Sequence, residues 1–128
     1  MCGIAGIYSK NAICDKSQIV KMTNSIAHRG PDGEGHWFSD DQRVALGHRR
    51  LSIIDLSSGG NQPMFYADRY VLIFNGEIYN YVELKKELQH KGYGFKSGSD
   101  TEVLLCLYHD LKEKCLEKVD GMFAFAIW

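Results

Sequence analysis

The chain opens with Met-Cys-Gly-Ile-Ala-Gly, residues 1–6, within a stretch that predicts a strand over residues 2–8 with a reactive cysteine at its start. A cysteine directly behind the initiator methionine is unusual. Removal of Met1 would leave a thiol and a free α-amine on one residue, Cys2. An α-amine and a thiol have ordinary pKa values of about 7.7–8.0 and about 8.5. Near neutral pH the amine can take the thiol proton, which gives an activated nucleophile with its own base. If Met1 is retained, its peptide bond removes that amine, and we expect an inactive species.

A simpler interpretation of Cys2 stands beside this one. Free cysteine usually behaves as a small buried apolar residue, so Cys2 could merely open a strand with Met1 in place. Its position alone favours that interpretation. Only the motifs further along the chain favour the nucleophile.

Composition bounds the class of protein. A chain of 128 residues is long enough for one domain with a real core, and 45% hydrophobic and 24% charged residues are ordinary for a soluble globular protein. The net charge is 15 minus 16, or −1, which gives no electrostatic basis for nucleic-acid or membrane binding. The longest apolar run, Met122–Trp128, is far too short to span a membrane. With no signal peptide and no paired cysteine framework among four cysteines, we expect a cytoplasmic protein.

Hydrophobic patterning predicts alternating strands and helices. Beyond residues 2–8, strands are predicted at 36–38 and 43–50, joined by a turn at 39–42, and at 70–74 and 122–128. Helices are predicted after three N-cap residues, Asp15, Asn80 and Ser99, each followed three positions later by Gln or Glu. The first helix has a predicted inner face of Ile19, Met22 and Ile26.

The loop at residues 28–35 contains three glycines and a proline, which exclude regular structure there. Arg29 and Asp32 are expected to lock it by an ion pair. The alternative is that the loop shapes a pocket near Cys2.

The stretch Ser58-Gly59-Gly60 is no pyrophosphate loop, because Gln and Pro follow where Asp and Ser are needed. No phosphate-binding motif is present, so no ATP site is expected in this chain.

Three polar segments are candidates for ligand contacts, two of them at the ends of predicted buried strands and one at a helix start. Arg49 and Arg50 end a strand and need anionic partners, either structural carboxylates or a ligand carboxylate that a planar guanidinium can grip. Asn75-Gly76 combines a side-chain amide with a flexible backbone N–H, the composition of an oxyanion hole, although a plain strand-to-helix turn is equally compatible. Asp100 lies at a helix start, where a carboxylate suits the helix dipole or a ligand ammonium. Cys106 and His109 share a helical face, but no second ligand pair accompanies them, so no metal site is predicted.

Six motifs in fixed order identify a family resemblance. They are Met-Cys-Gly-Ile at 1–4, His-Arg-Gly-Pro-Asp at 28–32, Leu-Gly-His-Arg-Arg-Leu-Ser-Ile at 46–53, Phe-Asn-Gly-Glu-Ile-Tyr-Asn at 74–80, Ser-Asp-Thr-Glu at 99–102 and Asp-Gly-Met-Phe-Ala-Phe at 120–125. Any one of them is weak, but together they resemble the glutaminase domain of glutamine-hydrolysing asparagine synthetases. That domain is a class II (type 2) glutamine amidotransferase of the N-terminal-nucleophile hydrolase superfamily. The resemblance covers residues 1–128.

The resemblance implies a role for each matching residue. Cys2 would be the nucleophile and its α-amine the base, while the Asn75 side chain and the Gly76 N–H would form the oxyanion hole. Arg50 would hold the α-carboxylate of glutamine, and Glu77 and Asp100 its α-ammonium. The backbone of Leu51 and Ile53 would line the same pocket. The expected products are glutamate and ammonia, through a glutamyl-thioester on Cys2.

The resemblance also implies an α+β fold, a four-layer αββα sandwich, truncated here at the C-terminus because related domains continue further. ATP and Mg²⁺ are expected only in a synthetase domain that is absent from these residues and that would amidate aspartate with the ammonia. Two alternatives remain: the glutaminase domain of another class II amidotransferase, making amino sugars or phosphoribosylamine, and an inactive glutaminase-like remnant. The final strand, 122–128, is expected to lack a partner on one edge, which favours self-association and is compatible with a homodimer.

Overall fold

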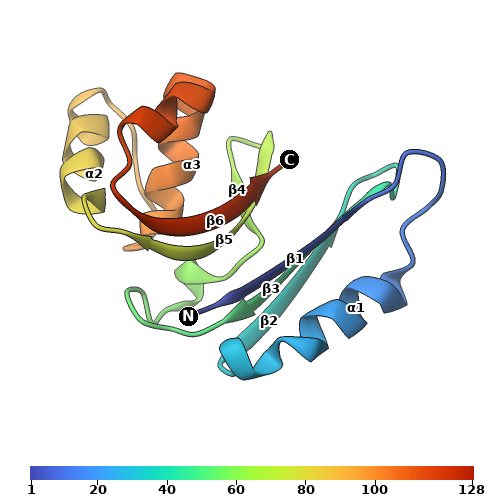
Figure 1. The fold of residues 1–128 in the computed structure, drawn as a ribbon. Coiled ribbons are helices and arrows are strands. Elements are labelled where there is room, and N and C mark those ends of the chain that lie inside the picture. Colours follow the sequence, from blue (N-terminus) through green and yellow to red (C-terminus); the bar gives the residue numbers. More distant parts are fainter.

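The computed structural model describes all 128 residues, which form four layers (Figure 1). One antiparallel sheet has the order β1 (Gly3–Tyr8), β3 (Val44–Arg50), β2 (Gly33–Phe38). The other has the order β4 (Met64–Tyr66), β5 (Tyr70–Ile78), β6 (Gly121–Ile127). Helix α1 (Lys16–Ser25) covers the first sheet, and α2 (Tyr81–His90) and α3 (Asp100–Leu111) cover the second. Three short 3₁₀ segments occupy Ala27–Arg29, Ser58–Gly60 and Lys112–Glu117. The predicted αββα sandwich is confirmed.

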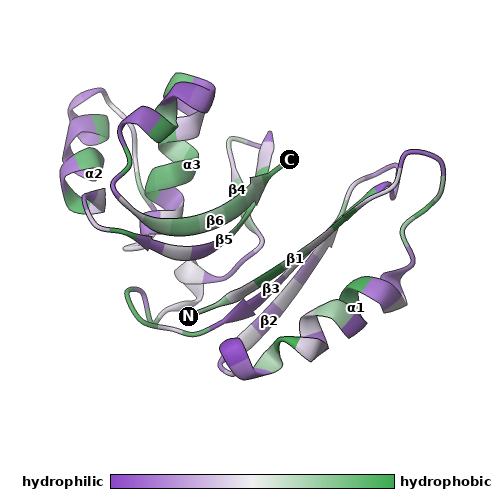
Figure 2. Cartoon of the chain, in the orientation of Figure 1, coloured by the Kyte–Doolittle hydropathy of each residue, from purple (hydrophilic) through white to green (hydrophobic).

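Three apolar clusters fill the three interfaces between the four layers. The largest, with 13 buried residues that include Leu72, Phe74 and Leu104, joins the second sheet to α2 and α3. A second cluster, built from Val44, Leu46, Val71 and Ile73, lies between the two sheets. A third, built from Cys14, Ile19 and Ala45, lies under α1. Figure 2 shows the apolar residues concentrated along β6 and α3.

Strand pairing brings the N-terminus to the end of β3. The β2–β3 hairpin forms as predicted, with Phe38 opposite Ala45 across the turn. The prediction that residues 28–35 exclude regular structure is wrong, because β2 begins at Gly33 and pairs there with Arg50 of β3. Strand β1 pairs on the other side of β3, with Gly3 opposite Arg49. Cys2 therefore lies just outside the ladder, beside the point where β3 gives way to a loop.

The predicted inner face of α1 is partly wrong. Ile19 is fully buried, but Met22 is 39% exposed and Thr23 is buried in its place. The helix crosses β3 at Gly47, where an added Cβ would lie 2.5 Å from the Thr23 methyl. Because the backbones approach so closely, only a small side chain fits. The Thr23 hydroxyl is satisfied by the Ile19 carbonyl and by the His36 ring.

None of the three predicted capping boxes forms in full. Asp15 accepts from the Ser17 N–H and Ser99 from the Thr101 N–H, as N-caps should. Asn80 precedes α2 but makes no capping bond, because its amide instead joins Lys118 and Asp120. The predicted partner of Ser99, Glu102, accepts from the N–H groups of residues 96 and 97 and from the Ser97 hydroxyl.

Strand β6 forms one edge of the second sheet. Strand β6 pairs with β5 alone, and the Val71 and Trp128 backbones exchange two hydrogen bonds of 2.9 Å. The Trp128 ring is 52% exposed, with its centroid 6.5 Å from that of Tyr8. None of the helices combines the length and the apolar character that crossing a membrane requires.

Candidate active site

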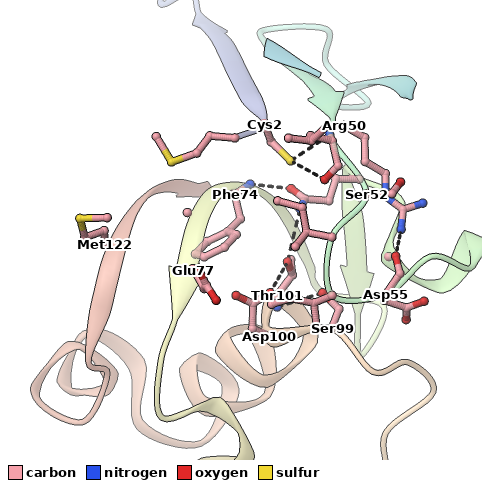
Figure 3. Close-up of a pocket in the computed structure, with 17 residues that line it drawn as sticks. Cys2, Arg50, Ser52, Asp55, Phe74, Glu77, Ser99, Asp100, Thr101 and Met122 are labelled. Carbon is pink, nitrogen blue, oxygen red and sulfur yellow. Dashed lines mark hydrogen bonds between the residues drawn. The ribbon is translucent and has the colours of Figure 1, made fainter. Parts of the chain in front are cut away.

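A pocket opens where the ends of β1, β3 and β5 meet the start of α3 (Figure 3). Segments that are far apart in the sequence contribute to it: residues 1–2, 50–55, 60–62, 74–77, 99–101 and Met122. Cys2 lies at its edge, and Arg50, Leu51, Ile53, Gly76, Glu77 and Asp100 also line it. Of the eight predicted site residues, seven line this one pocket, and Asn75 lies beside it in β5.

The Cys2 thiol is held by the backbone of Leu51. The Leu51 N–H donates to Cys2 Sγ at 3.3 Å, and the thiol lies 3.6 Å from the Leu51 carbonyl oxygen (Figure 3). The side chain is only half-buried, so a substrate can reach it. Leu51 was predicted to line the pocket, and the structure adds that its backbone contacts the Cys2 sulfur directly.

The predicted Arg29–Asp32 ion pair is wrong. Arg29 Nε donates to the Cys2 carbonyl at 3.0 Å, and Asp32 Oδ2 accepts from the Ser52 N–H at 2.8 Å. The two side chains therefore hold the chain on either side of the thiol. The alternative interpretation, that the loop at residues 28–35 shapes a pocket near Cys2, is the one the contacts support.

The two arginines at the end of β3 have different partners. Arg49 forms an ion pair with Glu34 at 2.7 Å and donates to the Thr23 carbonyl, which makes it a structural arginine. Arg50 has no carboxylate partner. Its guanidinium donates to Asn61 Oδ1 at 2.7 Å and to the Asp55 carbonyl, and it lines the pocket. No carboxylate of the chain pairs with Arg50, so its guanidinium can pair with an anionic ligand group.

Asn75 and Gly76 lie within β5, which continues to Ile78, and not at a turn as predicted. The strand continues because β6 pairs with it from Leu72 to Ile78. N–H groups along β5 alternate in direction, so those of Phe74, Gly76 and Ile78 point away from β6. Those of Phe74 and Ile78 donate to side chains. The Gly76 N–H between them faces the pocket without such a partner.

The Asn75 side chain is also free to hydrogen-bond a ligand. It is half-buried, its amide forms no hydrogen bond within the chain, and its Oδ1 is buried without a partner. An unpaired buried polar atom is costly, and such atoms concentrate where a ligand completes the site. Asn75 and Gly76 therefore offer two unused donors on adjacent residues.

Glu77 and Asp100 place two carboxylates on one wall of the pocket (Figure 3). Asp100 is buried, and its Oδ2 accepts from the Ile78 N–H at 3.1 Å. Burial raises the pKa of Asp100, and the nearby charge of Glu77 raises it further. A cation placed between the two carboxylates would relieve both effects.

Three contacts escaped the sequence analysis. Buried Gln62 accepts from the Phe74 N–H at 2.6 Å and donates to Thr101 Oγ1 at 3.3 Å, so it ties β5 to α3 beneath the pocket. Asp55 links the loop after β3 to Gly98. An amide or carboxylate inside a loop carries no periodic signal, so only the partners of these residues reveal their roles.

Ile53 lines the pocket, as predicted, but its side chain is 67% exposed.

The cysteine and histidine on one face of α3 do not form a metal site. Cys106 is buried and accepts from the Tyr66 hydroxyl at 3.3 Å. No three histidine, cysteine or carboxylate side chains lie close enough together to hold a metal ion.

Comparison with known proteins gives one consistent family. The family described as "Glutamine amidotransferase domain" matches residues 1–128. Asparagine synthetase [glutamine-hydrolyzing] 1 of Bacillus subtilis is 50% identical over 133 residues, which cover 100% of this chain and 21% of that protein. A Zea mays asparagine synthetase [glutamine-hydrolyzing] is 39% identical, covering 99% of this chain and 21% of its own length. The chain thus spans about a fifth of these relatives.

The fold is shared with a solved structure of lower sequence identity. The glutamine phosphoribosylpyrophosphate amidotransferase from B. subtilis, complexed with ADP and GMP, superposes with a TM-score of 0.79 at 24% identity. The match covers 98% of this chain and 34% of that chain.

Proposed function

This chain belongs to the glutamine amidotransferase domain family, and from that premise we propose that it hydrolyses the side-chain amide of glutamine at Cys2. The observation that carries the proposal is the half-buried Cys2 thiol, held by Leu51 at the edge of a pocket that also contains an unpaired arginine and two carboxylates. These charges match the two ends of an α-amino acid.

The proposed reaction needs only groups on this chain. Once Met1 is removed, the Cys2 α-amine accepts the thiol proton and Sγ attacks the amide carbon of glutamine. The negative charge on the amide oxygen is stabilised by the Asn75 side-chain amide and the Gly76 N–H. The amine then returns the proton to the leaving nitrogen, which departs as ammonia. Water hydrolyses the resulting glutamyl-thioester to glutamate and restores the thiol.

Substrate binding follows the charges of the pocket. Arg50 pairs with the α-carboxylate, because its guanidinium has no carboxylate of its own. Glu77 and Asp100 pair with the α-ammonium. Leu51 and Ile53 line the side from which the substrate chain approaches Cys2.

In the wider protein we propose that the ammonia amidates aspartate. The support is the printed activity of relatives at up to 50% identity, of which this chain covers about a fifth. ATP and Mg²⁺ would act in a synthetase segment, which is the partner we propose for this domain. The cytoplasm is the compartment in which such amino-acid synthesis and a free thiol are compatible.

The test compares three forms of the chain: one beginning at Cys2, one with the Met1 peptide bond intact, and Cys2→Ala. Each is incubated with glutamine, and glutamate and ammonia are measured, while intact-mass spectrometry records the N-terminus. The first form should release both products in equal amounts. The second keeps the thiol but lacks the amine, and the third lacks the thiol, so neither should turn over.

Two outcomes would contradict the proposal. Full activity with Met1 attached would exclude the amine as base. Retained hydrolysis in Cys2→Ala would exclude the nucleophile and with it the whole assignment.

A further inference from the structure

The guanidinium of Arg50 rests in a cradle made by the loop that follows it. The loop runs from residue 51 to residue 61, and its polar atoms near Arg50 are the Asp55 carbonyl and Asn61 Oδ1. Gly60 closes the cradle, since an added Cβ would lie 2.5 Å from Arg50 Nη2. The position of Arg50 therefore depends on the shape of this loop.

The Asp55 side chain fixes that shape from two directions. Its Oδ1 accepts from the Ser57 N–H at 2.8 Å and from the Ser57 hydroxyl at 2.6 Å, which folds the loop back on itself. Its Oδ2 accepts from the Gly98 N–H at 3.0 Å, two residues before Asp100. These bonds hold the pKa of Asp55 below its ordinary value, the Ser57 hydroxyl contributing most.

We propose that Asp55 is a positioning residue that sets the Arg50 guanidinium against the Asp100 carboxylate and so makes the pocket selective for α-amino acids. The inference rests on the proposed function, in which Arg50 takes the α-carboxylate and Asp100 the α-ammonium. Asp55 reaches both subsites. Its carbonyl accepts from Arg50 (Figure 3), and its carboxylate accepts from the Gly98 N–H in the segment that leads into α3.

The geometry of the ligand explains why such a link matters. In an α-amino acid the carboxylate and the ammonium are attached to one carbon, so their separation is fixed. A pocket that keeps its cation and its anion at the matching separation binds both groups at once. If the two subsites move independently, the ligand loses one of the two charged contacts and binds more weakly.

Two variants disturb the cradle in different ways. Asp55→Ala removes all three bonds that the carboxylate accepts. Gly60→Ala leaves Asp55 unchanged but pushes the flexible end of Arg50 aside, a change that the fold tolerates. Matched controls exist for both. Asp41 accepts from Ser39 and Arg43 at the distant β2–β3 turn, and Gly94 has open space around its Cα.

The experiment uses the chain beginning at Cys2 and two substrates, glutamine and 4-aminobutanamide, which keeps the ammonium and the amide but lacks the α-carboxylate. A charged hydrogen bond is worth enough to change binding by about tenfold or more. Asp55→Ala and Gly60→Ala should therefore raise KM for glutamine about tenfold or more, with a much smaller change in kcat. On 4-aminobutanamide their kcat/KM should match the wild type. Asp41→Ala and Gly94→Ala should match it on both substrates.

Each result decides the inference. Equal losses on both substrates would assign Asp55 a merely structural role, and an unchanged KM in a folded Asp55→Ala would remove it from the site. If Asp55→Ala fails to fold, as thermal unfolding would show, Gly60→Ala alone carries the test of the cradle, and an unchanged KM there overturns it. A wild-type chain that does not hydrolyse glutamine contradicts the proposed function, whereas an active wild type with unaffected variants contradicts this inference alone.

Discussion

At the residue scale, the contacts of a side chain in the fold decide between roles that its position in the sequence leaves open. Arg49 and Arg50 are neighbours of the same type, and the sequence offers each the same two interpretations. Their side chains project to opposite faces of β3, so Arg49 meets Glu34 while Arg50 enters the pocket. That the residues of the site lie together could be predicted, because the proposed chemistry needs a thiol, an arginine and carboxylates around one ligand. The Arg29 and Asp32 contacts could not, because they depend on which backbone atoms the loop brings within reach.

Asp100 should show a conflict between stability and binding. Because its pKa is raised in the folded state, the ionised carboxylate destabilises the fold at neutral pH, where the unfolded chain carries it freely. Asp100→Asn removes this charge and keeps an oxygen for the Ile78 N–H. We expect a higher unfolding midpoint together with a loss of about tenfold or more in kcat/KM for glutamine. Thermal unfolding and glutaminase kinetics measure the two effects.

Asp41→Asn is the control for Asp100→Asn, and its expected effect on the unfolding midpoint has the opposite sign. Hydrogen bonds from Ser39 and Arg43 lower the pKa of Asp41, so its ionised form favours the fold and its loss should lower the midpoint. Glutamine kinetics should not change. A lower midpoint in Asp100→Asn would contradict the idea that the site holds a strained carboxylate.

His48 should make the fold sensitive to acid. It is fully buried between the sheets, neither ring nitrogen has a hydrogen-bond partner, and burial lowers its pKa from 6.5 to about 4. Between these values the unfolded chain binds a proton that the folded chain does not. The free energy of unfolding should therefore fall as pH drops from 6.5 to about 4, by about 3 kcal/mol from this residue.

Urea unfolding at pH 7 and pH 4.5 tests the His48 prediction, because the carboxylates titrate alike in wild type and variant. His48→Gln should lose less stability on acidification than the wild type, by about 2–3 kcal/mol. His28→Gln, at an exposed position, serves as the control and should behave like the wild type. An identical acid response in His48→Gln and wild type would show that the imidazole is not the acid-sensitive group.

At the element scale, strand β5 shows how pairing overrides a local signal. Asn-Gly is typical of hairpin turns, yet here the pair lies in a nine-residue strand. The sequence predicts the apolar half of β5, residues 70–74, because this half is buried on both faces. It does not predict residues 75–78, whose strand conformation depends on β6, more than forty residues away in the chain. The starts of the three helices were predicted correctly. N-cap bonds are local, and Asp15 and Ser99 make them, whereas Asn80 precedes α2 without one.

Gly76 should be essential for the β5–β6 pairing. Its φ of +156° is rarely adopted by residues with side chains, and an added Cβ would collide with the Met122 carbonyl and lie 2.5 Å from Phe123 Cα. Gly76→Ala must push the two strands apart, because backbone cannot rotate away. We expect a loss of about 1–3 kcal/mol in the free energy of unfolding, with loss of glutamine hydrolysis as the Gly76 N–H moves.

The control for Gly76→Ala is Gly94→Ala, since Gly94 has nothing within 4 Å of an added Cβ. Urea unfolding of both variants gives the comparison. Equal stability of the two variants would mean that β6 does not approach β5 as closely at residue 76 as the structure has it.

At the scale of the whole molecule, the order of the six motifs predicted the arrangement of the layers, which the local strand and helix patterns did not. Composition and periodicity alone indicate strands and helices in one domain. The two-sheet sandwich followed from the resemblance, because which strands pair depends on contacts between distant segments. The separation of the core into three clusters, one for each interface, confirms the four layers. The pocket is likewise a property of the whole, since Cys2 just before β1, the end of β3, strand β5 and the start of α3 each contribute a side of it.

The same whole-molecule view predicts which half of amide transfer these 128 residues perform. The pocket offers charges for one amino acid, and the sequence contains no phosphate-binding loop. The purified chain beginning at Cys2 should therefore release glutamate and ammonia at a rate that ATP, Mg²⁺ and aspartate do not change, with no asparagine formed. Amino-acid analysis of reactions with and without these additions makes the comparison. Cys2→Ala reports any background hydrolysis. Asparagine formed in an ATP-dependent manner would show that the activating chemistry also resides in this chain, and that the glutamine pocket is not its only substrate site.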